Sequence, residues 1–149
     1  MSDNLRVLVI DDSPLDRRIF EKAFQNHGME VLTLGDPSKA LETTKEFNPS
    51  FIVLDLYMPD ISGFEVCTDL KVDPLTSEIP IIFVTGSDSI EDASRSLHMG
   101  IIDYFHKPVS IDNLVEQVVK HNLVENMNQI MKPIQKSMRS FCEKYKDGI

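Results

Sequence analysis

Short apolar runs alternate along the chain with segments in which apolar residues recur at helical spacing. Five runs, rich in Val, Ile and Phe, are too short for helices and are bounded by Asp, Gly or Pro: residues 5–10, 31–34, 51–54, 79–84 and 101–105. This pattern predicts five strands. Three of the runs are almost unbroken, which is typical of strands covered on both faces in a parallel sheet.

The first predicted helix has clear start and stop signals. Ser13 is suited to cap its N-terminus and Pro14 to occupy its first turn, while Gly28 is suited to end it. Its apolar stripe is predicted to consist of Leu15, Ile19 and Ala23, with Phe20 and Phe24 beside it.

Four further helices are predicted between and after the strands. They begin near Asp36, Gly63, Asp88 and Ser110. The helix from Asp88 carries Ile90, Ala93 and Leu97 and stops at Gly100. Strand and helix therefore alternate five times, which predicts an open α/β fold with a parallel sheet and helices on both faces.

Helical periodicity continues beyond the fifth unit, from residue 119 to residue 145. Eight apolar residues there follow one another about 3.7 positions apart: Val119, Leu123, Met127, Ile130, Ile134, Met138, Phe141 and Tyr145. Pro133 interrupts the stretch and predicts a kink or a break into two helices. We divide the chain into a domain over residues 1–122 and a helical extension over 123–149. The extension is open to three interpretations: a dimerising or partner-binding helix, a helix folded back on its own domain, or a linker stub.

Charge is distributed unevenly over the 149 residues. Residues 1–119 hold 9 Lys and Arg against 21 Asp and Glu (net −12), while residues 120–149 hold 6 against 3 (net +3). Because an acidic field repels phosphate backbones, direct binding to nucleic acid is disfavoured.

Cysteine usage and hydropathy bear on the compartment. Cys67 and Cys142 are too few for a disulfide framework and indicate free thiols in a reducing environment. No apolar run reaches the ~18 residues needed to cross a bilayer, and the N-terminus has no signal-peptide pattern. These features predict a cytoplasmic protein without membrane insertion.

Polar residues that could bind a ligand or take part in a reaction follow four of the apolar runs. Asp11 and Asp12 follow the first, Asp55 the third, Thr85 the fourth, and Lys107 comes shortly after the fifth. Since parallel strands all end at one edge of the sheet, and open α/β sheets bind ligands there, these side chains are predicted to share a site. Three carboxylates repel one another unless a cation lies between them, and carboxylate oxygens suit Mg²⁺. A lysine and a hydroxyl beside that cation provide what a phosphoryl group needs.

The full set of motifs resembles the receiver domain of bacterial two-component response regulators. The matching motifs are Asp11-Asp12, Asp55-Leu56-Tyr57-Met58-Pro59 with Gly63, Thr85-Gly86 and Lys107-Pro108. The resemblance covers residues 5 to about 120. It implies a flavodoxin-like (βα)₅ fold with five parallel strands in the order 2-1-3-4-5.

The resemblance also implies roles for the acidic residues. Asp55 would be the phosphoacceptor, a carboxylate nucleophile that takes a phosphoryl group from a phosphohistidine. Asp12 and Asp55 would ligate Mg²⁺ directly, Asp11 would act through a coordinated water, and Tyr57 would contribute its backbone carbonyl.

Three further residues would respond to the phosphoryl group. Lys107 would pair with its oxygens, and its peptide to Pro108 would be cis. Thr85 would swing to donate a hydrogen bond to it, and Gly86 would leave room for it. Tyr104 matches the aromatic switch position, so phosphorylation would shift the population of a two-state surface around the fourth helix and the fifth strand.

We interpret the chain as a response regulator that catalyses only its own phosphorylation and dephosphorylation. The partners implied are a sensor histidine kinase or phosphotransfer protein and a downstream protein target. A homodimer is also possible, through the fourth helix, fifth strand and fifth helix or through the extension. The last 30 residues cannot hold an effector domain, so the alternative is a receiver excised from a larger cyclase, phosphodiesterase or hybrid kinase. A phosphohydrolase using Asp55 is disfavoured, because Tyr57 stands where its second acid belongs.

Overall fold

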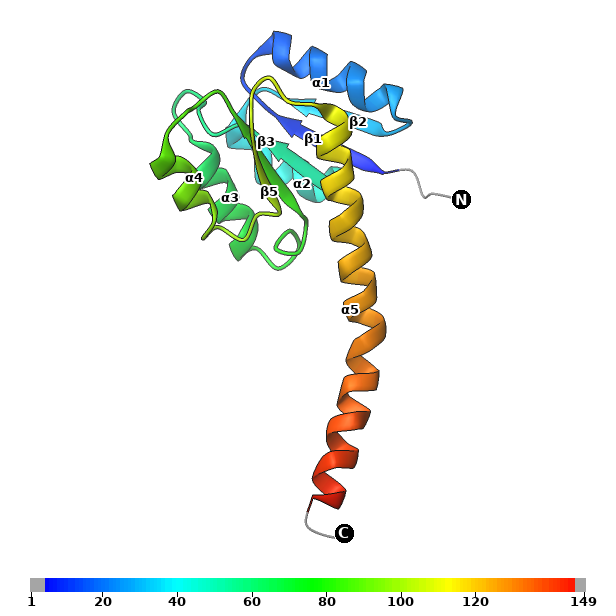
Figure 1. Cartoon of the computed structure of the whole chain (residues 1–149). Helices are drawn as coiled ribbons and strands as arrows, with labels where there is room; N and C mark the ends of the chain where they lie inside the picture. The colour runs from blue at the N-terminus through cyan, green and yellow to red at the C-terminus, as the bar shows by residue number, and fades with distance from the viewer. Residues whose placement is uncertain (1–4, 147–149) are drawn as a thin grey trace.

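Five parallel strands form one sheet in the order β2-β1-β3-β4-β5, as the resemblance implied (Figure 1). The computed structural model describes residues 5–146. The strands are β1 (Arg6–Ile10), β2 (Glu30–Leu34), β3 (Phe51–Leu54), β4 (Ile81–Thr85) and β5 (Asp103–His106). The predicted fourth and fifth strands each began two residues too early.

The helices begin where the sequence places capping residues. They are α1 (Pro14–Asn26), α2 (Ala40–Phe47) after a short 3₁₀ turn at Pro37–Lys39, α3 (Gly63–Val72), α4 (Ile90–Ser96) and α5 (Ile111–Tyr145). Ser13, Ser62, Ser89 and Ser110 cap α1, α3, α4 and α5, each accepting a hydrogen bond from the backbone N–H three residues on.

The sheet separates two apolar cores, so helices cover both of its faces, as predicted. On one face, residues of α1 and α5 pack on alternate strand residues: Phe20, Phe24, Leu114 and Val118. On the other face, residues of α2 and α3 do the same: Ala40, Phe64, Val66, Cys67 and Leu70. Strands β3 and β4 are buried along their whole length, as their unbroken apolar runs predicted.

The apolar stripe predicted for α1 is not its buried face, and two of the apolar residues noted on α4 are exposed. On α1, Leu15 and Ile19 are 67% and 54% exposed, while Phe20 and Phe24 are buried. The larger aromatic rings therefore face the core and turn the aliphatic pair towards solvent. On α4, Ile90 and Leu97 are 85% and 79% exposed.

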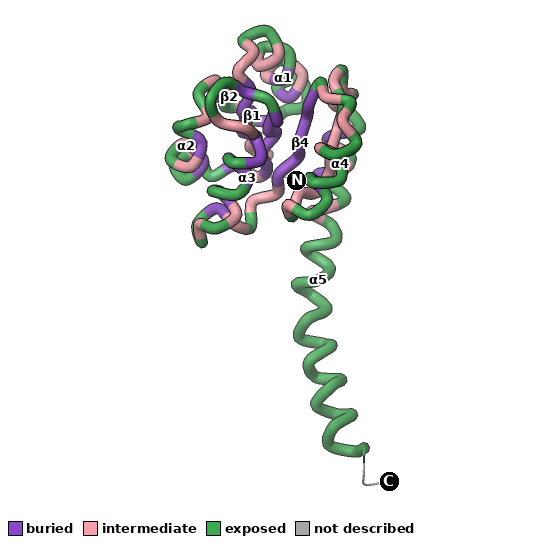
Figure 2. Tube along the Cα trace, turned by 90° about the vertical axis from the view of Figure 1, so that its left-hand side faces the viewer, coloured by how far each residue is buried: buried purple, intermediate pink, exposed green. Residues whose placement is uncertain are grey.

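Helix α5 leaves the domain and continues as a free rod (Figures 1 and 2). Its buried residues, Leu114 and Val118, lie in its first three turns, and every described residue from 123 on is exposed. Of the kink or break predicted at Pro133, the break is wrong, because one helix runs through this residue. The missing N–H leaves the carbonyl of Gln129 without its helical donor, and this exposed carbonyl can bond to water. The fold-back interpretation is also wrong. Among the described residues, no helix is long and apolar enough to cross a membrane.

Candidate functional site

Three carboxylates meet where β1 and β3 end. Asp11 and Asp12 follow β1 and Asp55 follows β3, and one oxygen from each lies within 4.8 Å of the others. Asp11 and Asp55 are buried. The sheet thus brings together the acidic residues that the spacing predicted, and this donor set is compatible with Mg²⁺.

Lys107 reaches into this cluster from the end of β5. Its Nζ lies 2.8 Å from Asp11 Oδ2, 2.8 Å from Asp16 Oδ2 and 3.7 Å from Asp55 Oδ2. Its backbone N–H donates to the carbonyl of Thr85 at 2.8 Å, and the peptide to Pro108 is cis. Burial lowers the pKa of the ammonium group, but the hydrogen bonds to Asp11 and Asp16 outweigh this and raise it overall. Lys107 therefore stays charged.

The surroundings of Asp55 disfavour its negative charge. Burial, followed by the nearby charge of Asp11, raises its pKa from 3.8 to about 6, while the charge of Lys107 opposes the shift. A buried carboxylate with a raised pKa at the carboxyl end of a strand is typical of a functional site. A cation or an added electrophile at this point would relieve the repulsion.

Backbone contacts hold the cluster in place. The backbone N–H of Ser13 donates to Asp11 Oδ1 at 2.9 Å, and Arg17 Nη1 donates to the Asp11 carbonyl at 2.8 Å. Gly63 donates its N–H to the Leu56 carbonyl at 2.8 Å, and a Cβ at this glycine would overlap the carbonyl oxygen of Asp55. The loop after β3 can therefore lie against α3 only because residue 63 has no side chain.

Thr85 and Tyr104 lie on neighbouring strands of the same sheet. Thr85 is buried, and its Oγ1 accepts a hydrogen bond from the Ser87 N–H at 3.1 Å. The Tyr104 hydroxyl is buried and has no hydrogen-bond partner among the described residues. Burial, followed by the negative charge of Asp92, raises the pKa of this hydroxyl. In this conformation the Tyr104 hydroxyl therefore makes no hydrogen bond to any described residue.

A hydrogen-bond network joins the loop after β3 to α4. The exposed Tyr57 hydroxyl donates to Asp92, and Ser87 Oγ donates to the same carboxylate oxygen at 2.9 Å. The bond to Asp92 raises the pKa of Tyr57. The contact of Tyr57 and Ser87 with Asp92 was not predicted from the sequence.

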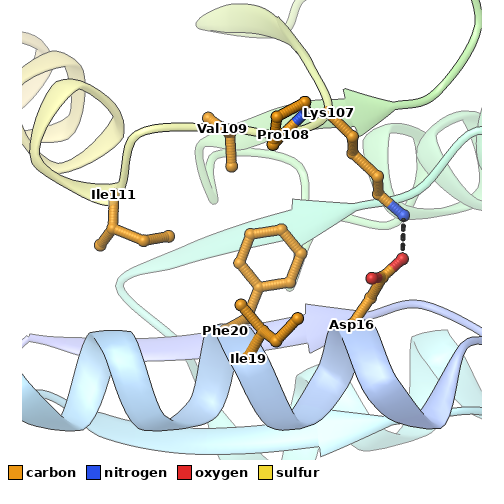
Figure 3. A pocket seen from close by; sticks show the side chains of 7 residues that line it. All are labelled: Asp16, Ile19, Phe20, Lys107, Pro108, Val109 and Ile111. Carbon is orange, nitrogen blue, oxygen red and sulfur yellow. Dashed lines mark hydrogen bonds and ion pairs between the residues drawn. The ribbon is translucent and has the colours of Figure 1, made fainter.

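Asp16 is a site residue that the sequence reasoning missed. It lies in the first turn of α1, and its contact with Lys107 depends on how that helix is turned, which the spacing of residues along the chain does not give. Beside it is a cavity of about 300 Å³ between α1 and the chain after β5 (Figure 3). Its other lining residues are mostly apolar: Ile19, Phe20, Lys107, Pro108, Val109 and Ile111.

Comparison with known proteins agrees with this geometry. The sequence matches the family model of the response regulator receiver domain over residues 7–119. It is 35% identical over 113 residues to the probable transcriptional regulator ycf27 of Porphyridium aerugineum, covering 76% of this chain and 46% of that protein. It is 34% identical over 119 residues to a probable cyclic di-GMP phosphodiesterase of Vibrio cholerae, covering 77% of this chain and 26% of that protein.

The structure also resembles solved structures of the same kind. The chemotaxis protein CheY4 of Vibrio cholerae superposes with a TM-score of 0.72 at 25% identity, covering 79% of this chain and 98% of that one. The chain spans between about a quarter and a half of the length of the two curated relatives described above. Its strand order, its acidic edge and these matches lead to one conclusion: the chain belongs to the family of response regulator receiver domains.

Proposed function

We propose that Asp55 accepts a phosphoryl group from a phosphohistidine and that this event switches a protein-binding surface. The observation that carries the proposal is the contact of Lys107 with the buried carboxylates of Asp11 and Asp55. A receiver domain acts in signalling, and a carboxylate flanked by a fixed cation and two acidic neighbours suits phosphoryl transfer.

In the proposed reaction, a carboxylate oxygen of Asp55 attacks phosphorus. The phosphorus–nitrogen bond of the donor breaks, its electron pair stays on the histidine nitrogen, and a phosphorus–oxygen bond to Asp55 forms. Lys107 lies close enough to neutralise the phosphoryl oxygens. Asp11, Asp12, Asp55 and the Tyr57 carbonyl would hold Mg²⁺, which supplies further positive charge to the transferring group.

The proposed switch connects the site to α4. Thr85 exchanges its bond with the Ser87 N–H for one that it donates to the phosphoryl group. Ser87 also holds Asp92, which holds Tyr57, so a shift of the Thr85 strand end disturbs the start of α4. Tyr104, whose hydroxyl lacks a partner among the described residues, turns inward and exposes a changed surface.

The proposed phosphoryl donor is a sensor histidine kinase or a phosphotransfer protein. The exposed Leu15 and Ile19 and the cavity beside Lys107 offer an apolar docking face next to Asp55. Because such kinases use ATP, the same proposal places the protein in the cytoplasm. A downstream protein reads the switched surface, and a second copy of the chain is a further proposed partner.

We infer that the only reactions catalysed are the chain's own phosphorylation and dephosphorylation. The domain would comprise residues 1–122, with residues 123–149 as its extension. The alternative is a receiver that regulates a larger effector. We retain this alternative because the chain covers only 46% and 26% of the two curated relatives.

The test is phosphorylation by a small phosphoryl donor, such as phosphoramidate, with Mg²⁺, followed by intact-mass spectrometry. The wild-type chain should gain one phosphoryl group, and Asp55→Asn should gain none. Asp60→Asn is the matched control, because it removes one carboxylate from an exposed position in the same loop. Equal labelling of Asp55→Asn and the wild-type chain would refute the proposal, and so would labelling unaffected by removal of Mg²⁺.

A further inference from the structure

The free part of α5, residues 123–145, carries an apolar stripe whose side chains are all exposed. Eight side chains of the stripe are between 40% and 66% exposed: Leu123, Met127, Ile130, Met131, Ile134, Met138, Phe141 and Tyr145. The exposed Cys142 lies beside them. Figure 2 shows the whole of this segment exposed, in contrast to the domain.

The spacing of the stripe is regular. From Met127 the apolar positions step by 3, 1, 3 and 4 residues and then repeat, so that each of four positions recurs eleven residues later. The recurring pairs are Met127 and Met138, Ile130 and Phe141, Met131 and Cys142, and Ile134 and Tyr145. An eleven-residue repeat is 3.67 residues per turn, which keeps one seam facing a partner helix along its whole length.

A helix with this sequence is not expected to hold its shape alone. Helical stability in proteins comes mainly from the packing of an apolar face rather than from intrinsic propensity, and the apolar face of this segment packs on nothing within the part of the chain that the structure describes. Pro133 removes a hydrogen bond from the middle of the free segment and weakens it further. A partner along the stripe would therefore stabilise the extended form of α5.

The apolar area of the stripe, if all of it is buried, reaches the lower end of the area that specific dimers bury. At roughly 110 Å² per fully exposed aliphatic side chain, eight half-exposed side chains offer about 500 Å² on each copy. Two copies would then bury about 1,000 Å², which is the lower limit for a specific interface. No charged residue stands at the four repeating positions between 123 and 145, so pairing would bury no unpaired charge.

We propose that the partner is a second copy of this chain, and that residues 123–145 of two copies form a two-stranded coiled coil with an eleven-residue repeat. Two identical helices require the same spacing on both sides of the seam, and the repeat provides it. The coil is nearly straight with a slight right-handed twist. The proposal does not depend on phosphorylation of Asp55.

Sedimentation equilibrium of the full chain tests the proposal. The wild-type chain should have twice its monomer mass of 17.0 kDa at micromolar concentration. Ile134→Asp puts a charge into the seam and should raise the dissociation constant at least tenfold. Ser140→Asp is the matched control, because it adds the same charge on the far side of the helix and should leave the dimer intact.

Three results would overturn the proposal. They are a monomeric wild-type chain, equal association of Ile134→Asp and the wild-type chain, and equal weakening by Ser140→Asp. Binding of the monomer to anionic lipid vesicles, lost in Ile134→Asp, would instead assign the stripe to a membrane surface. Asp55→Asn should dimerise like the wild-type chain, so failure of this proposal and failure of the phosphorylation proposal give different results.

Discussion

At Asp55 the fold holds a carboxylate in surroundings that favour its protonated form. Its pKa of about 6 in the folded chain lies above the ordinary value of 3.8, because burial and Asp11 outweigh the attraction of Lys107. The folded state therefore binds the proton more tightly than the unfolded state does. The contribution of Asp55 to the free energy of unfolding should therefore rise as the pH falls from about 6 towards 3.8. Above pH 6 the carboxylate is ionised in the folded chain and should destabilise the fold.

Asp55→Asn in metal-free protein makes this linkage measurable. At about pH 8 the variant should be more stable than the wild-type chain, because it has no buried charge at position 55. The difference in free energy of unfolding should shrink by about 1 kcal/mol on going to about pH 5. Urea unfolding at both pH values checks this, with Asp60→Asn as the control. A difference that stays constant with pH would contradict the raised pKa.

Two glycines close to the site should respond differently to substitution by alanine. A Cβ at Gly63 would overlap the Asp55 carbonyl and lie 2.8 Å from the Leu56 Cα, so Gly63→Ala must displace backbone. We expect it to lower the free energy of unfolding by about 1–3 kcal/mol. A Cβ at Gly86 would meet no atom within 4 Å, so Gly86→Ala should keep the wild-type stability to within about 1 kcal/mol.

The Gly86→Ala substitution should slow phosphorylation without changing the stability of the fold. The resemblance implies that residue 86 leaves room for the phosphoryl group, so the variant should fold normally and be labelled more slowly than the wild-type chain. Denaturant unfolding and intact-mass labelling measure the two properties separately. Equal loss of stability in both variants would show that the open space at Gly86 is not present in solution.

At the scale of helices and strands, the sequence predicted the features that depend on local signals. The starts of α1 and α5 follow from Ser13 and Ser110, because a capping hydroxyl acts within its own turn. The rotation of α1 was wrong because its apolar residues define two adjacent faces. Periodicity cannot choose between them, and only packing against the sheet selects the aromatic pair, Phe20 and Phe24, over the aliphatic one.

In the candidate site, too, some features follow from local sequence signals and others depend on packing between elements. The residues predicted to share it could be placed at one edge because each stands at or just beyond the end of a parallel strand: Asp11, Asp12, Asp55, Thr85 and Lys107. The contacts of Asp16 with Lys107 and of Asp92 with Tyr57 join side chains from different elements. Such contacts depend on how each helix is turned and on which rotamers pack, and no local pattern in the sequence encodes this.

At the scale of the whole molecule, the chain consists of an acidic domain and a mildly basic rod. The domain carries the buried cores, and the last fully buried residue among those described is Val118. A chain ending after Asn122 should therefore keep the cooperative unfolding of the domain. Its melting temperature should not depend on protein concentration, whereas that of a dimeric full chain should rise with concentration.

Full-length Ile134→Asp is the control for this truncation, because it keeps the extension but should lose the coiled coil. If residues 123–145 serve only for pairing, the truncated chain and Ile134→Asp should unfold at the same temperature, and Mg²⁺ with beryllofluoride should stabilise both. If the truncated chain instead unfolds without cooperativity, the extension contributes to the domain itself, and the division at residue 122 would have to be abandoned. Calorimetry at two protein concentrations distinguishes these results, because only a dimer couples association to unfolding.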